Sequence, residues 1–577
     1  MAFLRNLLAT LVGLFIFSTI AFFLLIGIIV AASKDEIPEV KANTVIYLRM
    51  SGVLEEKAVV DPFLEALGNT PKVHSLLDII NTIKSAKNDD RVKGIYLEPM
   101  YLSGGYAALQ EIRDVLVDFK DSGKFVYAYG EYMSESDYYV ASVADSLFLN
   151  PTGAMEFNGL SVNITFFKGM FEKLDIEPEI FRVGEFKSYV EPYIRKDLSK
   201  ENELQYTELL ESIYGTFLRN LSKSIHKSEE ELMEISNLMK ASLPKDAEAF
   251  GLIHRLGYQD ELKSVIKEKI GLDEKQDLKM MTMDKYAQAI SAESKYSKNR
   301  VAVIVAEGNI VMGGDEGIVG TTYAKEIRKA RNNDRVKAIV LRINSGGGSL
   351  TASDIIWREL MLTKGKKPII ASMSTAAASG GYYIAMLADT IIAQPNTITG
   401  SIGIFGMWFN FGEFLENKIG ITHDVVKTGE YADIYTLTRS LRDVERAIIQ
   451  RGVDEGYETF TQKAADARGM SLDELNKIAG GRVWSGEQAL ENGLIDQLGS
   501  FSDAIESAVK AAGIEEDYSV TYYPEEKPFI EEFLEKMSAR IQVFLFGAET
   551  KPIIKQIEKL KQLQGIQVRV PGDLVVY

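Results

Sequence analysis

The chain has 577 residues, enough for two or more domains, and its 46% hydrophobic and 25% charged content is typical of a folded protein. Its formal net charge of −17 argues against a protein that binds nucleic acid through a basic surface. Cysteine is absent, which excludes cysteine nucleophiles, thiolate metal sites and disulfides. The four histidines lie far apart and match no zinc-binding spacing, so we expect neither a metal nor another cofactor.

The N-terminal segment 7–32 is an apolar run without a charged residue. As a helix it would be about 39 Å long, more than the ~30 Å that the hydrocarbon core of a membrane requires. A cleaved signal peptide is the alternative, although the apolar part of such peptides usually spans only about 7–15 residues. Residues 1–6, before the apolar run, contain one cationic side chain, that of Arg5. Positive charge on this side favours a cytoplasmic N-terminus. We expect a single-pass anchor at 7–32, with the rest of the chain outside the cytoplasm.

The remainder of the chain contains an internal duplication. Three pairs of segments recur in the same order: DDRVKGIYL (89–97) with NDRVKAIVL (333–341), DYYVASVAD (137–145) with GYYIAMLAD (381–389), and FGLIHRLG (250–257) with NGLIDQLG (492–499). Collinear matches of this kind predict two homologous domains, at 43–285 and 299–514. A tail at 515–577 follows, and the sequence leaves its role open.

Short β-branched runs alternate with amphipathic segments within each domain. In the second domain, strand-like runs at 301–308, 337–343 and 367–374 are separated by helix-like segments at 323–334 and 351–364. This alternation predicts an α/β fold of βαβ units on a mostly parallel sheet. An α/β protein without enzymatic activity would show the same alternation, so the fold class alone does not give the function.

Lys187 lies in the first domain, within FRVGEFKSYVEPY (181–193). The corresponding segment of the second domain is VKTGEYADIYTLT (426–438), which places Ala432 opposite the lysine. Most lysines are surface residues, so this one is either a surface side chain or a buried general base.

The second domain contains the glycine-rich segment RINSGGGSLTASD (342–354), which reads as a strand end, a loop and a helix start. Such a loop can direct backbone N–H groups at an anionic oxygen, because glycine permits close approach. A simple glycine-rich turn is the alternative. The spacing differs from that of a nucleotide-binding P-loop.

Ser379 lies in STAAASGGYYIA (374–385), between a strand-like and a helix-like run. A hydroxyl at a helix start is either a nucleophile beside free N–H groups or an ordinary helix cap. The duplication helps to choose, because the first domain has Glu135 at the position of Ser379. One domain thus has the serine without the lysine, and the other has the lysine without the serine. This reciprocal loss favours an active site shared between the two domains.

A lysine can act as a base only when its amine is neutral. With an ordinary pKa near 10.4, about 0.1% of the amine would be unprotonated near pH 7.5. Lowering the pKa by about 3 units costs ~4 kcal/mol, which burial between the domains could impose. Lysine is an accepted alternative to histidine as the partner of a nucleophilic serine.

These motifs, together with TGSIGI (399–404), the apolar N-terminus and the duplication, resemble the signal peptide peptidase A family in its long, protease IV form. The resemblance implies tandem crotonase/Clp-protease-like domains and a membrane-anchored serine peptidase with a Ser/Lys dyad. It implies Ser379 as the nucleophile, Lys187 as the base and Ser401 as the residue that orients the lysine. Gly347 and Gly380 would supply the backbone donors of an oxyanion hole. The family often has Ser-Pro-Gly-Gly where this chain has a serine followed by three glycines.

The resemblance further implies that the substrates are cleaved signal peptides and other apolar peptides, on the periplasmic side of the inner membrane. It also implies a homo-oligomer, a tetramer in the resembling family. The run IFGMWFNF (404–411) is either a core strand or a wall of the peptide groove. Two other functions stay open at this point: a tandem crotonase-like enzyme acting on acyl-CoA, and a catalytically inactive membrane scaffold.

Overall fold

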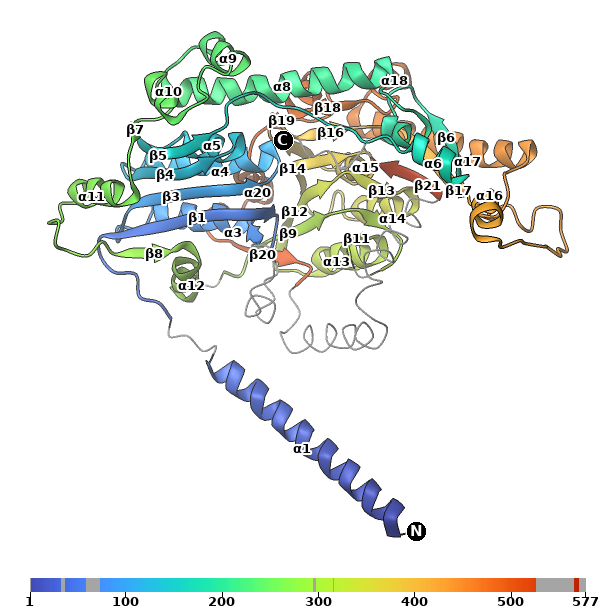
Figure 1. Ribbon diagram of the computed structural model, residues 1–577, viewed down its shortest axis with the longest axis horizontal. Coiled ribbons are helices and arrows are strands. Elements are labelled where there is room, and N and C mark those ends of the chain that lie inside the picture. Colours follow the sequence, from blue (N-terminus) through green and yellow to red (C-terminus); the bar gives the residue numbers. More distant parts are fainter. Residues whose placement is uncertain are drawn as a thin grey trace.

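The computed structural model describes residues 2–32, 37–58, 73–293, 297–314, 316–525 and 565–569. Helix α1 (Ala2–Ala32) stands apart from the body of the molecule (Figure 1). Within the described ranges, no helix combines the length and the apolar character needed to cross a membrane. Helix α1 covers the segment 7–32, whose role as a membrane anchor stays a prediction. The charged segment KPIIKQIEKLKQLQ (551–564) of the tail, whose sequence is helix-like, lies outside the described residues.

The first domain is built on a seven-stranded sheet. Its strands are, in spatial order, β2 (Val73–Ser75), β1 (Thr44–Glu55), β3 (Val92–Ser103), β4 (Phe125–Met133), β5 (Ser146–Met155) and β7 (Arg255–Leu256), with β8 (Met280–Thr282) also paired to β1. All of these pairings are parallel. Because consecutive parallel strands need crossover connections, helices lie between them, as the βαβ pattern predicts.

The second domain repeats this arrangement on an eight-stranded sheet. Its strands are β18 (Val483–Ser485), β16 (Ile398–Gly400), β14 (Ile369–Ala378), β12 (Val336–Ser345), β9 (Arg300–Glu307) and β20 (Ser519–Tyr523), with β15 (Thr390–Ala393) also paired to β14, and β19 (Gln497–Leu498) paired to β15. The order β9-β12-β14-β15-β19 matches β1-β3-β4-β5-β7 strand for strand. The predicted duplication and α/β class are confirmed. Strand β20 pairs with β9, so part of the predicted tail completes this sheet.

A third sheet joins the two domains. Its strands are β11 (Ile318–Val319), β10 (Ile310–Val311), β13 (Gly347–Ser349), β21 (Gly565–Arg569), β17 (Ile404–Asn410) and β6 (Glu177–Val183). Strand β6 comes from the first domain and pairs antiparallel with β17 of the second along its whole length. Strand β17 is buried throughout, so residues 404–410 of the run at 404–411 form a core strand. This sheet brings the segment that follows β6 to the second domain.

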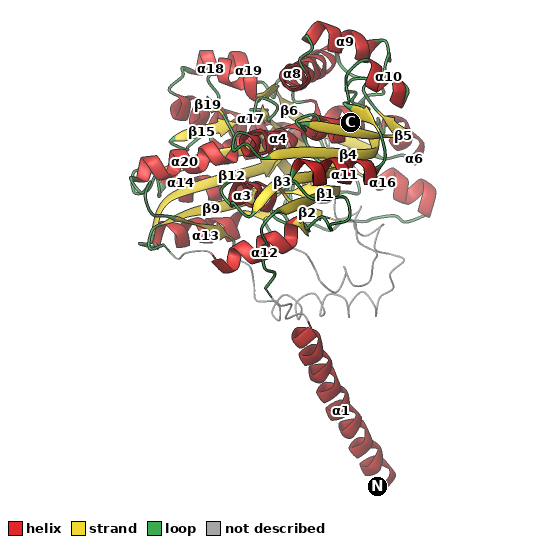
Figure 2. Cartoon of the chain, turned by 90° about the vertical axis from the view of Figure 1, so that its left-hand side faces the viewer, coloured by secondary structure: helices red, strands yellow, loops and turns green. Residues whose placement is uncertain are grey.

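Helices cover the sheets of both domains (Figure 2). In the first domain they are α3 (Leu76–Lys87), α4 (Tyr106–Lys120), α5 (Glu135–Ala141), α6 (Lys168–Leu174), η1 (Ser188–Val190), α7 (Glu191–Ile194), α8 (Lys200–Ile225), α9 (Glu229–Asn237), α10 (Pro244–Ala249), α11 (Gln259–Lys269) and α12 (Met283–Glu293). In the second they are α13 (Gly320–Asn332), α14 (Leu350–Met361), α15 (Gly380–Ala385), α16 (Gly412–Phe414), η2 (Leu415–Ile419), α17 (Asp443–Arg468), α18 (Leu472–Ile478), α19 (Gly486–Glu491) and α20 (Phe501–Ala512).

Helix ends follow local sequence signals. Helix α20 begins with a capping box, in which the side chains of Ser500 and Asp503 each accept a backbone N–H of the other residue. It ends at Gly513, whose φ of 64° is in the left-handed region that glycine tolerates. Helices α3 and α14 begin at capping serines, Ser75 and Ser349, each of which accepts an N–H from the first turn.

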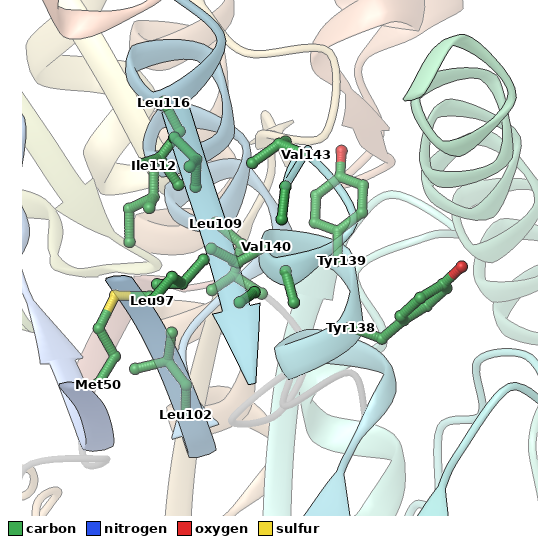
Figure 3. Close-up of a cluster of buried hydrophobic side chains, with 14 of the residues drawn as sticks. Met50, Leu97, Leu102, Leu109, Ile112, Leu116, Tyr138, Tyr139, Val140 and Val143 are labelled. Carbon is green, nitrogen blue, oxygen red and sulfur yellow. The ribbon is translucent and has the colours of Figure 1, made fainter. Parts of the chain in front are cut away.

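The hydrophobic core of the first domain gathers between helices α4 and α5 and the sheet. Figure 3 shows side chains of α4 (Leu109, Ile112 and Leu116) and of α5 (Tyr139 and Val140), all of them in one buried cluster. Their spacing of three and four residues along α4 is that of one helix face. The same cluster extends to side chains of β14, β16 and β18, so the two domains share part of a core.

Candidate active site

Ser379 occupies a sharp turn between β14 and α15. Its backbone has φ 55° and ψ −111°, a region that side-chain-bearing residues rarely adopt. Such a conformation costs on the order of 1–3 kcal/mol and persists only where the surroundings impose it. Here the N–H of Ser379 donates to the carbonyl of Gly400 at 2.8 Å, and a methyl group on Gly381 would lie only 2.5 Å from the carbonyl oxygen of Ser345. Close packing therefore forces the turn that presents the serine.

Lys187 reaches this turn from the first domain. It follows β6 by a few residues, in a segment that lies against a pair of glycines of the second domain. The N–H of Phe186 donates to the carbonyl of Gly480 at 3.0 Å, and a methyl group on Gly481 would lie 2.6 Å from the backbone nitrogen of Lys187. A side chain at Gly481 would therefore push the lysine segment away.

The structure brings Lys187, Ser379 and Ser401 together. Nζ of Lys187 lies 2.8 Å from Oγ of Ser379, within the range of about 2.6–3.2 Å predicted for a base and its nucleophile. The amine is also 3.1 Å from Oγ and 3.2 Å from the carbonyl oxygen of Ser401. A neutral amine has two N–H groups and one lone pair. Its two N–H groups match the two oxygens of Ser401, which leaves the lone pair for the hydroxyl of Ser379.

The surroundings favour the neutral amine. Lys187, Ser379 and Ser401 all have 0% relative exposure. Burial lowers the pKa of Lys187 well below its ordinary value, and among the described residues it is the one cause of this shift. No carboxylate in the described parts of the chain forms an ion pair with this amine. A buried lysine that faces hydroxyls and carbonyls loses its proton more easily than one at the surface.

The two predicted oxyanion donors lie side by side. A methyl group on Gly347 would come within 2.6 Å of the backbone nitrogen of Gly380. The N–H of Gly347 donates to Oγ of Ser345 at 3.1 Å, and that hydroxyl donates to the carbonyl of Gly308 at 2.6 Å. In this structure the N–H of Gly347 is therefore already hydrogen-bonded to the hydroxyl of Ser345. Helix α15 has six residues, so an oxyanion at its start would be stabilised by individual N–H groups more than by a long-range helix dipole.

Three features of the site were not predicted. The pair Gly480 and Gly481 supports Lys187, and adjacent glycines in the sequence are the signal that could have revealed a close approach. The hydroxyl of Ser345 accepts the N–H of Gly347. In the family that the sequence resembles, the corresponding serine is often followed by proline. Strand β21 lies against the glycine loop, between β13 and β17. Among the described residues, no cluster of His, Asp or Glu is arranged to bind a metal ion.

The duplicated α/β fold and the sequence together define the class of the protein, a serine peptidase. The family model of peptidase family S49 matches residues 118–273 and 361–515, one stretch in each domain, and the chain belongs to this family. The match covers both halves of the duplication, although Ser379 occurs only in the second and Lys187 only in the first.

Curated relatives agree with this assignment. Protease 4 of Salmonella typhi is 33% identical over 541 residues, which cover 90% of this chain and 86% of the relative. Protease 4 of Haemophilus influenzae is 35% identical over 466 residues, 78% of this chain and 75% of the relative. The chloroplastic serine protease SPPA of Arabidopsis thaliana is 33% identical over 511 residues, 86% of this chain and 74% of the relative. A solved ClpP1 structure from Listeria monocytogenes has a TM-score of 0.24 at 16% identity, covering 35% of this chain and 94% of that chain.

Proposed function

We propose that this S49 serine peptidase is an endopeptidase that cleaves apolar peptides with a Ser379/Lys187 dyad. The observation that supports the dyad most directly is the 2.8 Å separation between Nζ of Lys187 and Oγ of Ser379, both fully buried. Its substrates would be released signal peptides and similar apolar chains. We also propose a crotonase/Clp-like fold for the two domains at 43–285 and 299–514.

In the first step, Oγ of Ser379 attacks the scissile carbonyl carbon and its proton passes to Nζ of Lys187. The carbonyl oxygen becomes an oxyanion, which accepts the N–H of Gly380 and, once the hydroxyl of Ser345 turns away, the N–H of Gly347. Collapse of the tetrahedral intermediate breaks the C–N bond, and Lys187 gives its proton to the leaving amine. The product is an ester between Ser379 and the acyl part of the peptide.

Water then hydrolyses the ester. Lys187, neutral again, takes a proton from the water as its oxygen attacks the ester carbonyl. The second tetrahedral intermediate collapses, the proton returns to Oγ of Ser379 and the acid product leaves. Ser401 orients the amine in both steps, because its two oxygens hold the N–H groups of Lys187 away from the nucleophile.

Hydrolysis of a fluorogenic apolar peptide by Ser379→Ala and Lys187→Ala tests this proposal, with Lys196→Ala as a matched control at an exposed lysine. We expect both dyad variants to retain the fold and to lose hydrolysis, while the control keeps the full rate. Unchanged hydrolysis in either dyad variant would contradict the dyad. Binding of coenzyme A by a wild type without peptidase activity would instead favour an acyl-CoA enzyme.

We further propose that residues 7–32 anchor the chain in the plasma membrane, that the two domains lie on its extracytoplasmic (periplasmic) side, and that the chain forms a homo-oligomer. The support for the anchor is the length of the apolar run without charge. The protein should stay with membranes in alkaline carbonate and be released by detergent. Release by carbonate alone would contradict the anchor, and a single protomer in detergent would contradict the oligomer.

A further inference from the structure

Helix α8 of the first domain extends over the second domain. In Figure 1 it runs along the top of the view, between α9 of the first domain and α18 of the second, and Figure 2 shows the same order. It contacts strand β18: Oγ of Ser212 lies 2.7 Å from Oγ of Ser485, and the N–H of Val483 donates to Oε1 of Gln205 at 3.4 Å. Gln205 has 1% relative exposure, so its amide is buried between the two domains.

The backbone around Lys187 forms a tight turn. The N–H of Ser188 donates to the carbonyl of Phe186 at 2.8 Å, and Lys187 between them has φ −76° and ψ 71°. These angles are those of an inverse γ-turn, in which a hydrogen bond between its two neighbours encloses one residue. Because the side chain of Lys187 leaves the backbone at the middle of this turn, any rotation of the turn moves Nζ relative to Oγ of Ser379.

The amide of Gln205 binds both ends of this turn. Its Nε2 lies 2.7 Å from Oγ of Ser188 and 3.3 Å from the carbonyl oxygen of Phe186. Nε2 also donates to Oδ1 of Asn202 at 2.9 Å, while Oε1 accepts the N–H of Val483. An amide has donors on one atom and an acceptor on the other, so these partners all agree with one orientation of the side chain. The amide therefore joins the turn to the second domain.

Buried polar groups hold Asn202 in turn. Its Nδ2 donates to the carboxylate of Glu191 at 3.0 Å, and the hydroxyl of Ser199 donates to the same carboxylate at 2.6 Å. Asn202 has 2% and Glu191 0% relative exposure. The side chain that binds the turn is thus itself oriented by buried partners, which restricts its rotamer.

The duplication sets this glutamine apart. Helix α17 is the counterpart of α8: both have 26 residues, and SIYGTF (212–217) of α8 matches EGYETF (455–460) of α17. The same alignment places Ile448 opposite Gln205, and Ile448 has 38% relative exposure. The domain that lacks the lysine therefore also lacks the amide. This pattern ties Gln205 to the lysine rather than to the packing of the helix.

We propose that Gln205 is a positioning residue of the peptidase, whose amide holds the turn around Lys187 and so sets the direction from which the amine meets Ser379. This inference rests on the proposed function, because it needs Lys187 to take part in the reaction. Gln205 contacts the turn, Asn202 and β18, so it acts on the reaction through Lys187. Without the amide the turn rotates more freely, the amine leaves its contact with Ser379 for part of the time, and water reaches it.

Gln205→Met tests the proposal, because methionine keeps the length of the side chain, suits a helix and removes the amide. We expect kcat for a fluorogenic apolar peptide to fall about tenfold to a hundredfold, the effect of misplacing a reacting group slightly, with little change in KM. The midpoint of the alkaline rise in kcat should move up by at least ~0.5 pH unit, because water that reaches the amine returns the pKa of Lys187 toward its ordinary value.

Ser212→Ala is the matched control. It removes a hydrogen bond from the same helix to the same strand of the second domain, without touching the turn. It should keep the wild-type kcat and the wild-type midpoint. A role of Gln205 in domain packing alone would lower the stability of both variants and leave the midpoint of both unchanged.

The charged and titratable side chains around the turn are the same in all of these variants. Arg182 lies 3.9 Å from the carboxylate of Glu191, and Arg482 of the second domain forms an ion pair with Glu208 of α8. Tyr457 of α17 has a pKa that burial raises. Because none of these groups is altered, a midpoint that moves only in the glutamine variant reports on the lysine amine.

Ser188→Ala removes one end of the same contact with a smaller change to the core. We expect a loss in kcat of about threefold to tenfold, the rate equivalent of one hydrogen bond. In the double variant with Gln205→Met, kcat should fall no further than in Gln205→Met alone, because both changes remove the same interaction. Losses that multiply in the double variant would contradict the assigned contact.

The proposal is overturned if Gln205→Met keeps the wild-type kcat and midpoint, or if it behaves like Ser212→Ala. Hydrolysis by Lys187→Ala separates this outcome from a failure of the proposed function. If Lys187→Ala retains hydrolysis, the dyad fails and the role of Gln205 fails with it. If Lys187→Ala is inactive while Gln205→Met behaves as the wild type, the positioning role alone is wrong.

Discussion

Arg342 and Lys187 are both cations with 0% relative exposure, yet their surroundings differ. Arg342 lies at the junction of the domains between two carboxylates of the first domain, with Nε 2.7 Å from Glu56 and Nη1 2.7 Å from Glu111. Two serine hydroxyls, those of Ser372 and Ser374, accept its remaining N–H groups at 2.9 Å. Lys187 also crosses between the domains, but it meets two serines and no carboxylate among the described residues.

Burial alone therefore does not decide the protonation of these two groups, because the carboxylates around Arg342 oppose its effect. Burial lowers the pKa of Arg342, but Glu111 and Glu56 outweigh it and the net shift is upward. Burial lowers the pKa of Lys187 and nothing opposes it. Arg342 is therefore expected to stay charged between the domains, whereas Lys187 has no carboxylate among the described residues to hold its proton, as the proposed mechanism requires. The predictions below test this difference, from the largest expected effect to the smallest.

Lys187→Arg should abolish peptide hydrolysis, with a loss in kcat/KM of about 10⁴- to 10⁶-fold. Arginine keeps its proton at any accessible pH, so it cannot accept one from Ser379. The measurement is hydrolysis of a fluorogenic peptide by folded protein. Lys187→Met, which keeps the apolar stem without an amine, should lose as much activity and controls for folding. More than about a tenth of the wild-type rate in Lys187→Arg would show that this position does not act as a base.

Arg342→Met should lower the free energy of unfolding by about 3–5 kcal/mol, because it leaves two buried carboxylates without a counter-charge. Thermal or denaturant unfolding measures the loss. The matched control is the triple variant Arg342→Met, Glu56→Gln, Glu111→Gln, in which neither carboxylate remains, and most of the stability should return. A single variant as stable as the wild type would mean that the ion pairs do not hold the domains together.

The sequence predicted much of the site because the duplication acts as an internal comparison. Ser379 and Lys187 each stand out only against the copy that lacks them, Glu135 in one case and Ala432 in the other. The same comparison predicted two homologous domains, and the strands of their sheets repeat in the same order. The roles of these residues are still proposals, although the predicted contact between them is present.

Other parts of the site depend on contacts that no local pattern encodes. The hydrogen bond from the N–H of Gly347 to Ser345 depends on the rotamer of the serine and on the conformation of the glycine loop. Strand β21 has a weak alternation of apolar and polar residues, but nothing in five residues tells which edges it will join. Arg342 also looks like an ordinary strand residue until its partners, more than two hundred residues away, are seen. Such pairings are properties of the folded chain.

Ser401→Gly should reduce kcat/KM about tenfold to a hundredfold, the rate equivalent of one hydrogen bond to a reacting group. The variant removes the hydroxyl that contacts the amine of Lys187, and glycine suits the backbone at this position, since Ser401 has a φ of 50°. The backbone carbonyl still accepts from the amine, so the loss should be smaller than that of Lys187→Met. Ser401→Ala provides the second measurement. Full activity in both variants would show that the carbonyl alone positions the amine.

Lys187 should also make stability depend on pH. Because its pKa is lowered in the folded state, the unfolded chain binds this proton more tightly. Between the folded-state pKa and the ordinary value near 10.5, the free energy of unfolding should therefore rise with pH, by at most about 1.4 kcal/mol per pH unit. Below that window the full cost of the buried amine is present, and above it the cost vanishes.

Lys187→Met isolates this contribution, because it removes the amine and leaves every other titrating group. The difference in unfolding free energy between variant and wild type should favour the variant at neutral pH and shrink toward alkaline pH. Over the same range, kcat/KM of the wild type should increase as the amine loses its proton. A stability difference that does not change with pH, or a flat rate profile from about pH 6 to 9, would mean that Lys187 keeps an ordinary pKa despite its burial. The contrast with Arg342 would then be lost, because both buried cations would be charged under all of these conditions.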